Sequence, residues 1–314
     1  MEVGMSLSRR TLLIAAAGSA LAGCQPAAEP AGRVTAAAPV AGPLPPTAPE
    51  PEPSTGPEAA AGPAAAPATA SGAPATSATP VDRADVTARY AGVEPSEWGL
   101  DVTGVLTSLP AGEQATALTF DACGGPGGSG YDADLIEFLR AHEVPATLFL
   151  NARWIDANPA EFESLAGDPL FEIANHGTLH RPLSVTGRSA YGIAGTGDAG
   201  EAYDEVAGNL AKLTALLGRP PRFFRSGTAH YDDVATRIAA DLGQRVAGFT
   251  VNADAGATFS SAQVREEVAA TPPGAVVIAH LNHPGGGTAP GFAAALPPLL
   301  AAGRRFTRLS DVLG

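Results

Sequence analysis

Basic side chains are scarce in this chain of 314 residues, which has 19 Lys and Arg against 32 Asp and Glu and a formal net charge of −13. It lacks a positive stripe that could neutralise phosphates, which excludes nucleic acid as an obvious partner. Two cysteines are too few for a disulfide scaffold. No collagen or heptad repeat and no second long apolar run occurs, which excludes collagen, coiled coils and multi-span membrane proteins.

Aromatic residues are absent from residues 25–82, a stretch that holds 14 of the 29 prolines. Such a segment buries too little apolar surface to offset the entropy lost on ordering it. We therefore predict that residues 25–83 are a disordered Ala/Pro-rich linker, and that residues 84–314 form one domain.

The first 24 residues are typical of an export signal, because Arg9 and Arg10 precede a short apolar run that ends in small residues. This run is too short for a confident spanning helix. Residues 21–24 (Leu-Ala-Gly-Cys) resemble the bacterial lipobox, which makes Cys24 the predicted lipidation site. The expected location is the extracytoplasmic face of the cell membrane, reached through a lipid anchor.

From residue 115 onward, short apolar runs alternate with amphipathic stretches. This alternation predicts parallel strands with right-handed helical crossovers, and we expect an α/β fold, a distorted seven-stranded (β/α) barrel. Residues 84–113 are expected to add a strand pair beside it. The predicted strands are residues 115–120, 145–150, 170–174, 222–224, 245–251, 275–279 and 305–309, and the predicted helices are 132–142, 200–217, 231–242 and 292–302.

Ionisable residues directly follow the predicted strands. The carboxyl ends of parallel strands converge on one face of a barrel, where active sites form. The sequence therefore predicts an active site at that face. The residues that lie just past an apolar run are Asp121, His176, Arg225, Asp254 and His280.

The residue types at these strand ends suggest metal-assisted hydrolysis. His176 and His180 are four residues apart, and two such imidazoles can ligate one metal ion. Asp121 is the candidate general base, which Arg225 would hold ionised through a bidentate contact. His280 suits general-acid catalysis, because imidazole titrates near neutral pH. The structural alternatives are a helix N-cap for the aspartate, a surface ion pair for the arginine and a core histidine at the last position.

Residues 125–130 (Gly-Pro-Gly-Gly-Ser-Gly) match the G-x-G-x-x-G fingerprint of dinucleotide-binding folds. The acidic residue expected about 20 positions later is missing, since the second predicted strand ends at Asn151 and Ala152. We interpret the glycines instead as a mobile loop at the mouth of the site.

Residues 114–314 resemble the polysaccharide deacetylases, carbohydrate esterase family four with the NodB-like fold. The ordered motifs together are specific, although each alone is not. A fourth motif, at residues 252–254, lacks the usual Trp. The matching motifs are Thr119-Phe120-Asp121-Ala122, His176-Gly177-Thr178-Leu179-His180, Arg222-Phe223-Phe224-Arg225 and Ile278-Ala279-His280.

The resemblance implies a divalent metal held by His176 and His180, with zinc expected and cobalt or nickel as alternatives. It also implies four catalytic roles: Asp121 as base, Arg225 as its partner, His280 as acid and Asp254 as the residue that orients His280.

Ala122 is the main departure from the family pattern, which places a ligating carboxylate there. Water can complete the coordination, or Cys123, Asp132 or Asn175 can replace the missing ligand, or metal binding is lost. Cys123 is a soft ligand suited to zinc, but a shift of one residue along a strand turns a side chain to the opposite face.

The sequence thus predicts a hydrolase that removes N-acetyl groups from an N-acetylhexosamine polysaccharide, such as peptidoglycan or a chitin-like chain. The alternatives are a catalytically impaired glycan-binding lipoprotein and an esterase acting on O-acetyl groups. The expected partners are the glycan and the membrane, and we expect a monomer. His283 is expected at the rim of the pocket.

Overall fold

The computed structural model describes residues 81–314. The predicted export signal, Cys24 and residues 25–80 of the predicted linker lie outside this range. Helix α1 (Arg83–Arg89) begins at the last residue of the predicted linker, and its N-cap Asp82 accepts a hydrogen bond from the Asp85 backbone N–H. Within residues 81–314, no helix has the length and apolar character needed to cross a membrane.

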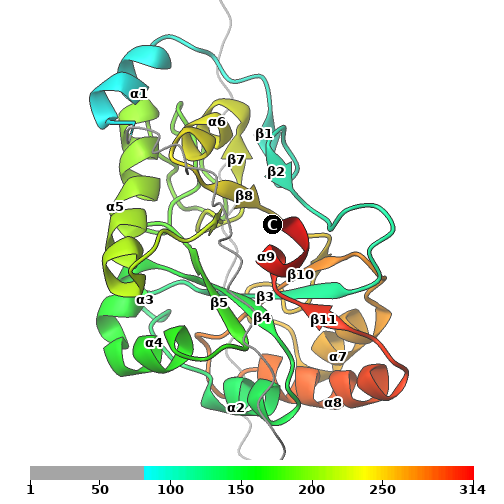
Figure 1. Cartoon of the computed structure of the whole chain (residues 1–314). Helices are drawn as coiled ribbons and strands as arrows, with labels where there is room; N and C mark the ends of the chain where they lie inside the picture. The colour runs from blue at the N-terminus through cyan, green and yellow to red at the C-terminus, as the bar shows by residue number, and fades with distance from the viewer. Residues whose placement is uncertain (1–80) are drawn as a thin grey trace, which may run out of the picture. The chain divides into compact units, whose positions relative to one another are not determined.

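A parallel sheet forms the centre of this part of the chain (Figure 1). Its strand order is β2-β8-β6-β5-β4-β3-β10-β9, and β11 also pairs with β3. A separate antiparallel pair consists of β1 and β7. The strand bounds are β1 Trp98–Gly99, β2 Val105–Leu106, β3 Thr116–Ala122, β4 Ala146–Leu150, β5 Phe171–Asn175, β6 Phe223–Phe224, β7 Tyr231–Asp232, β8 Arg245–Ala247, β9 Val251–Asn252, β10 Val276–His280 and β11 Phe306–Thr307.

The predicted α/β fold with a distorted parallel barrel is confirmed, and it takes the form of a half-barrel. Each predicted strand overlaps a strand of the structure. The segment 245–251 divides into β8 and β9, and β2 joins the sheet, so that the main sheet within residues 81–314 has nine strands rather than seven. Strands of two residues are too short for a readable alternation of apolar and polar side chains.

Residues 84–113 do not form the expected strand pair, since β1 pairs with β7 and β2 pairs with β8. The carboxylate of Glu97, just before β1, accepts hydrogen bonds from the backbone N–H and the hydroxyl of Thr103, which lies between β1 and β2, both at 2.6 Å. The two strands join different sheets.

Helices cover the outer face of the sheet, where α8 lies against α2 and α7, and α5 packs on α1, α6 and β5 (Figure 1). Four of them match the predicted helices, although β7 takes the first two residues of the segment 231–242. The remaining bounds are α2 Ala133–Ala141, α3 Ala152–Ala157, α4 Pro159–Ala166, α5 Ala199–Leu217, α6 Asp233–Asp241, α7 Ser261–Ala270, α8 Thr288–Ala301 and α9 Leu309–Leu313.

Alternation along the strands separates an outer face from an inner one. Leu118, Phe120 and Ala122 of β3 pack in a large apolar cluster with the helices. Ala117 instead belongs to an inner cluster with residues of the neighbouring strands. Asp121 lies on the same side as Ala117, because strand side chains alternate with period two. The inner face thus changes from apolar to ionisable at the carboxyl ends of the strands.

Candidate active site

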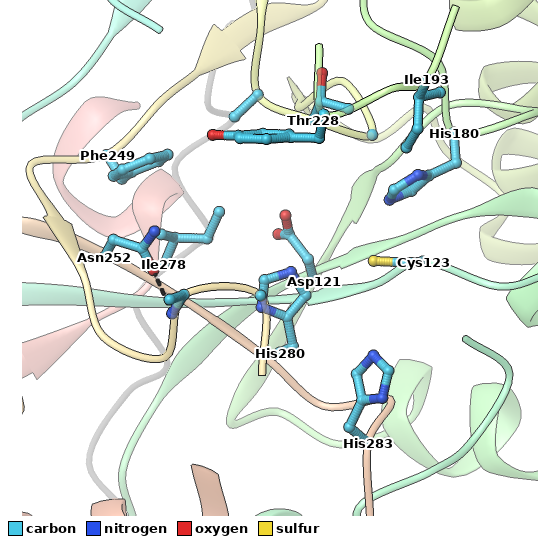
Figure 2. Close-up of a pocket in the computed structure, with 15 residues that line it drawn as sticks. Asp121, Cys123, His180, Ile193, Thr228, Phe249, Asn252, Ile278, His280 and His283 are labelled. Carbon is cyan, nitrogen blue, oxygen red and sulfur yellow. Dashed lines mark hydrogen bonds between the residues drawn. The ribbon is translucent and has the colours of Figure 1, made fainter. Parts of the chain in front are cut away.

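Strand register brings Asp121 and His280 together, because these two residues are paired on the parallel neighbours β3 and β10. Both line a cavity of about 390 Å³. Figure 2 shows them around the same space as Cys123, His180 and His283. Groups that are far apart in the sequence therefore meet at one mouth of the sheet.

Arg225 anchors Asp121 from below the cavity. Its Nη1 donates to Asp121 Oδ1 at 2.7 Å, while Nε and Nη2 donate to the carbonyls of Ala247 and Gly248 at 3.1 and 2.9 Å. The guanidinium also stacks 4.1 Å from the ring centroid of Phe149. Its contact with the carboxylate is therefore single, not the bidentate contact expected from the sequence, because the other N–H groups bind backbone. One carboxylate oxygen stays free of the arginine.

His176 presents its Nε2 to the site. Its Nδ1 lies 3.0 Å from the Arg225 carbonyl, which can only accept, so Nδ1 carries the proton and Nε2 has a free lone pair in the neutral ring. Nε2 lies 3.6 Å from Asp121 Oδ2 and 3.9 Å from Cys123 Sγ. Burial lowers the pKa of His176, but the charge of Asp121 and the neighbouring thiol outweigh burial, and the pKa lies above its ordinary value.

His180 packs its ring edge-on to His176, with the centroids 5.0 Å apart. Its Nε2 is buried and has no hydrogen-bond partner. Its backbone is left-handed, with φ +63°. Gly227 permits this close packing, since a Cβ there would collide with the ring and backbone of His180. An unpaired ring nitrogen is costly in a buried place unless something binds it.

Glu205, on α5, holds the loop that carries His180. Its carboxylate accepts hydrogen bonds from the backbone N–H of Leu179 at 3.1 and 3.0 Å and from that of Arg181 at 3.2 Å. Burial raises the pKa of Glu205 despite these hydrogen bonds. Glu205 was not identified as a site residue from the sequence. The sequence feature connected with it is Gly177, because a Cβ at that position would collide with the Glu205 carboxylate.

The donor set of Cys123, His176 and His180 fits a metal ion. Their ligand atoms all lie within 4.8 Å of one another. Tetrahedral zinc with ordinary bond lengths needs a sulfur–nitrogen separation of about 3.5 Å, close to the 3.9 Å between Cys123 Sγ and His176 Nε2. The free lone pair on His176 and the orphaned Nε2 of His180 point to the same conclusion.

The thiol of Cys123 has the chemistry of a ligand. Burial acts to raise its pKa, but the neighbouring imidazoles of His176, His180 and His280 outweigh burial and hold the pKa well below its ordinary value. The thiolate is the form that binds metal.

The other proposed replacements for the missing carboxylate lie elsewhere. Ala122 is fully buried in the outer apolar cluster, so Cys123 is the residue that turns back toward the site, like Asp121. Asn175 faces α5, where its side chain binds the Val206 carbonyl and Asn209. Asp132 caps α2 through the Leu135 backbone N–H at 3.2 Å and does not line the cavity.

His280 and Asp254 form a largely buried pair at the end of β10, the strand next to Asp121. His280 Nδ1 lies 2.9 Å from Asp254 Oδ1, and the His280 backbone N–H and the Thr288 hydroxyl donate to Oδ2 at 2.7 and 3.0 Å. Burial lowers the pKa of His280, but the Asp254 carboxylate outweighs it and holds the pKa well above its ordinary value. Burial raises the pKa of Asp254, and the contacts with His280 overcome this and lower it.

The glycine-rich segment 125–130 is tied down rather than free at the mouth. Asn282 donates to the Gly128 carbonyl at 2.8 Å, and Trp154 Nε1 donates to the Gly130 carbonyl at 2.7 Å. None of these glycines lines the cavity. The segment instead connects β3 to α2 beside the site.

Residues 109–247 match the family model described as polysaccharide deacetylase. The match supports a polysaccharide deacetylase domain. No curated protein matches the sequence.

Several solved structures share the fold of this chain. A family 4 carbohydrate esterase pseudoenzyme from Bacillus anthracis is 20% identical with a TM-score of 0.57, over 68% of this chain and 70% of that chain. PdaA of Bacillus subtilis, a family 4 carbohydrate esterase, is 18% identical with a TM-score of 0.55, over 67% and 85%. The Bc1960 peptidoglycan N-acetylglucosamine deacetylase is 22% identical with a TM-score of 0.54, over 66% and 91%.

The contact between Glu205 and the loop of His180 leads to a testable prediction. Glu205→Gln replaces one acceptor oxygen by an amide that faces backbone N–H donors, which loosens His180. We expect metal affinity to fall about 10–100-fold, as for other residues that orient a ligand. Competition with a chromophoric chelator measures this affinity. The exposed Glu163→Gln serves as the control, and equal affinities for the two variants would contradict the positioning role.

The outward direction of Ala122 leads to a second prediction. Ala122→Asp puts a carboxylate into the outer apolar cluster, and we expect the free energy of unfolding to fall by about 3 kcal/mol or more. Urea unfolding measures this loss, with the exposed Ala91→Asp as control. Tighter metal binding at unchanged stability would instead mean that position 122 faces the site.

Proposed function

We propose that this protein is a metal-dependent hydrolase that removes N-acetyl groups from an N-acetylhexosamine polysaccharide of the cell envelope. The observation that carries the proposal is the arrangement of two devices at one cavity. Cys123, His176 and His180 form a donor cluster beside Asp121, and His280, held by Asp254, lies on the other side of Asp121 at the end of the neighbouring strand.

A divalent metal bound by Cys123, His176 and His180 would supply a Lewis acid that polarises the acyl carbonyl and acidifies water. Zinc suits a thiolate and two imidazoles, and cobalt is a close substitute. The set replaces the family's expected carboxylate with a sulfur ligand.

Asp121 is suited to act as general base. Arg225 fixes one of its oxygens, and the other lies 3.6 Å from His176 Nε2 and thus beside the donor cluster. The free oxygen of Asp121 would therefore be close enough to accept a proton from a water molecule that attacks beside the cluster.

His280 is suited to act as general acid. Asp254 holds its Nδ1, so that Nε2 is left for the cavity, and keeps the ring protonated to higher pH. The proton on Nε2 would go to the departing nitrogen, which makes it a better leaving group. Asp254 is a positioning residue in this scheme.

A glycan substrate is supported by the match to the polysaccharide deacetylase family model and by the structural similarity to a peptidoglycan N-acetylglucosamine deacetylase. The predicted lipoprotein signal supports an envelope location. Fractionation of cells that express the wild type and Cys24→Ala tests the anchor. We expect the wild type in the membrane fraction and the variant outside it, and identical distributions would refute the anchor.

Acetate release tests the proposed reaction. The full chain, loaded with zinc or cobalt, is incubated with N-acetylated chito-oligosaccharides and with peptidoglycan. We expect acetate from at least one of them, loss of activity with a chelator, and a fall of about 10³-fold or more in Asp121→Asn. No acetate release from either substrate, or an Asp121→Asn variant as active as the wild type, would refute the proposal.

A glycan-binding protein without catalysis is the second candidate, because Ala122 replaces a ligating carboxylate and a neighbour of the same fold is described as a pseudoenzyme. Elemental analysis separates the two functions. Substoichiometric metal together with tight glycan binding would favour the binding protein. A panel of O-acetylated substrates separates an esterase from an amidase.

A further inference from the structure

Tyr191 stands exposed at the mouth of the cavity. It is 76% exposed and lines the cavity together with Ile193. It occupies the first central position of a tight turn, in which the Ala190 and Ile193 backbones bond each other at 3.1 and 2.9 Å. Its φ of +52° and the +76° of Gly192 are values at which Asn and Gly are usual and a bulky aromatic is unfavourable. An exposed tyrosine held in such a conformation indicates a use for its ring.

A row of stacked side chains supports this ring. Tyr191 meets His230 edge to face, with centroids 5.1 Å apart at 90°. The ring of His230 in turn lies 5.8 Å from the ring of Trp98, measured between centroids. The Arg188 guanidinium lies over the Trp98 ring, 5.0 Å from its centroid. The Thr228 carbonyl fixes His230 Nδ1 at 2.8 Å. The row therefore supports Tyr191 from one side while most of its ring stays exposed.

The segment before the sheet supplies part of this support. β1 pairs with β7, which places Trp98 opposite Asp232 and next to the His230 segment. Three segments that are distant in the sequence thus converge on one ring at the mouth of the cavity. Residues 84–113, which have no part in the chemistry, acquire a role through this contact.

The chemistry of the surrounding wall favours an uncharged ring. Phe249, Ile193 and Ile278 add apolar surface to the cavity, and Figure 2 shows Phe249 and Ile193 on opposite sides of it. Among the described residues that line the cavity, no Lys or Arg is present to pair with an anionic substituent. A pyranose offers a flat C–H face that stacks on an aromatic ring without needing a counter-charge.

We propose that Tyr191, held by the row of His230, Trp98 and Arg188, stacks on the sugar ring next to the one that reacts, so that the protein prefers an oligosaccharide over a single N-acetylhexosamine. This inference rests on the proposed function. It adds a second point of contact outside the donor cluster and the His280–Asp254 pair.

Calorimetric binding tests this role without requiring turnover. The full chain carrying Asp121→Asn, loaded with zinc, is titrated with an N-acetylated chitotetraose, alone and combined with Tyr191→Gly or Tyr191→Phe. We expect Tyr191→Gly to bind the tetrasaccharide about three- to tenfold more weakly and Tyr191→Phe to bind it as the parent does. Glycine suits the turn, so its melting temperature should stay within about 3 °C of the parent.

A small activated acetate ester provides the second readout, because it is too short to reach Tyr191. With Asp121 intact, Tyr191→Gly should hydrolyse this ester at the wild-type rate. Equal tetrasaccharide affinities in the glycine variant and its parent would overturn the inference, as would a parent that does not bind the tetrasaccharide. Absence of acetate release, with tetrasaccharide binding that depends on Tyr191, would refute the proposed reaction and leave the stacking role supported.

Discussion

Asp254→Asn is expected to reduce kcat by about 10²–10⁴-fold, the usual contribution of a positioned acid or base. The asparagine still fits the space, but its amide either donates toward His280 Nδ1 or leaves the ring weakly held. The ring then loses both its orientation and the charge that keeps it protonated. Steady-state acetate release measures the loss, with the exposed Asp311→Asn as control.

The same variant should move the alkaline limb of activity to lower pH. His280 must be protonated to act as an acid, and Asp254 raises its pKa well above the ordinary value of 6.5. Removing the carboxylate lowers that pKa, so the protonated form disappears at a lower pH. An alkaline limb at the wild-type position in Asp254→Asn would contradict the assignment of His280 as the acid.

The His280–Asp254 pair also makes the stability of the protein depend on pH. Because the folded pKa of His280 is raised, its contribution to stability is fully present below the ordinary value of 6.5 and is lost as the pH rises through the folded pKa. The pKa of Asp254 is lowered, so its contribution is present above its ordinary value and is lost as the pH falls through the folded one. Urea unfolding is measured from a pH below the ordinary pKa of Asp254 to a pH well above that of His280. We expect the free energy of unfolding of the wild type to fall more than that of Asp254→Asn at both the acidic and the alkaline end.

Arg225→Met is expected to lower the free energy of unfolding by about 3–5 kcal/mol. Arg225 is fully buried, and its removal leaves the Asp121 carboxylate without its cation and the carbonyls of Ala247 and Gly248 without their donors. Methionine fills much of the volume, so the loss reports the unpaired polar groups more than a cavity. Urea unfolding at neutral pH measures it.

A double-mutant cycle separates the ion pair from the carbonyl contacts. In an Asp121→Asn background, Arg225→Met should cost less, because no buried carboxylate is then left unpaired. Arg305→Met, at a side chain that is 72% exposed, should change stability by about 0.5 kcal/mol or less. An equal cost of Arg225→Met in both backgrounds would contradict the importance of the Asp121 contact.

The sequence allowed the central strands and their carboxyl ends to be predicted because β3, β4, β5 and β10 are largely apolar stretches of five to seven residues. Stretches of that length can be recognised as buried strands from their residue types. In a parallel sheet their carboxyl ends lie at the same edge, which brings Asp121, His176 and His280 together. The two-residue strand β2 offers no such pattern and was not predicted, and its place in the sheet follows from its pairing with β8.

The remaining parts of the site depend on contacts that a sequence does not display. Which of Ala122 and Cys123 faces the cavity depends on where β3 stops alternating. Glu205 looks like any acidic residue of an amphipathic helix until the loop of His180 folds over it. Tyr191 acquires its setting from Trp98, which is far away in the chain.

The central claim is that Cys123, His176 and His180 bind one metal ion, and cobalt spectroscopy tests it most directly. Co²⁺ is added to the metal-free full chain, and the absorption is compared in the wild type, Cys123→Ser and His180→Ala. We predict one equivalent of cobalt in the wild type, with the intense near-ultraviolet charge-transfer absorption of a thiolate ligand, which Cys123→Ser loses. A cobalt site with the same spectrum in Cys123→Ser, or no cobalt binding by the wild type, would contradict the account.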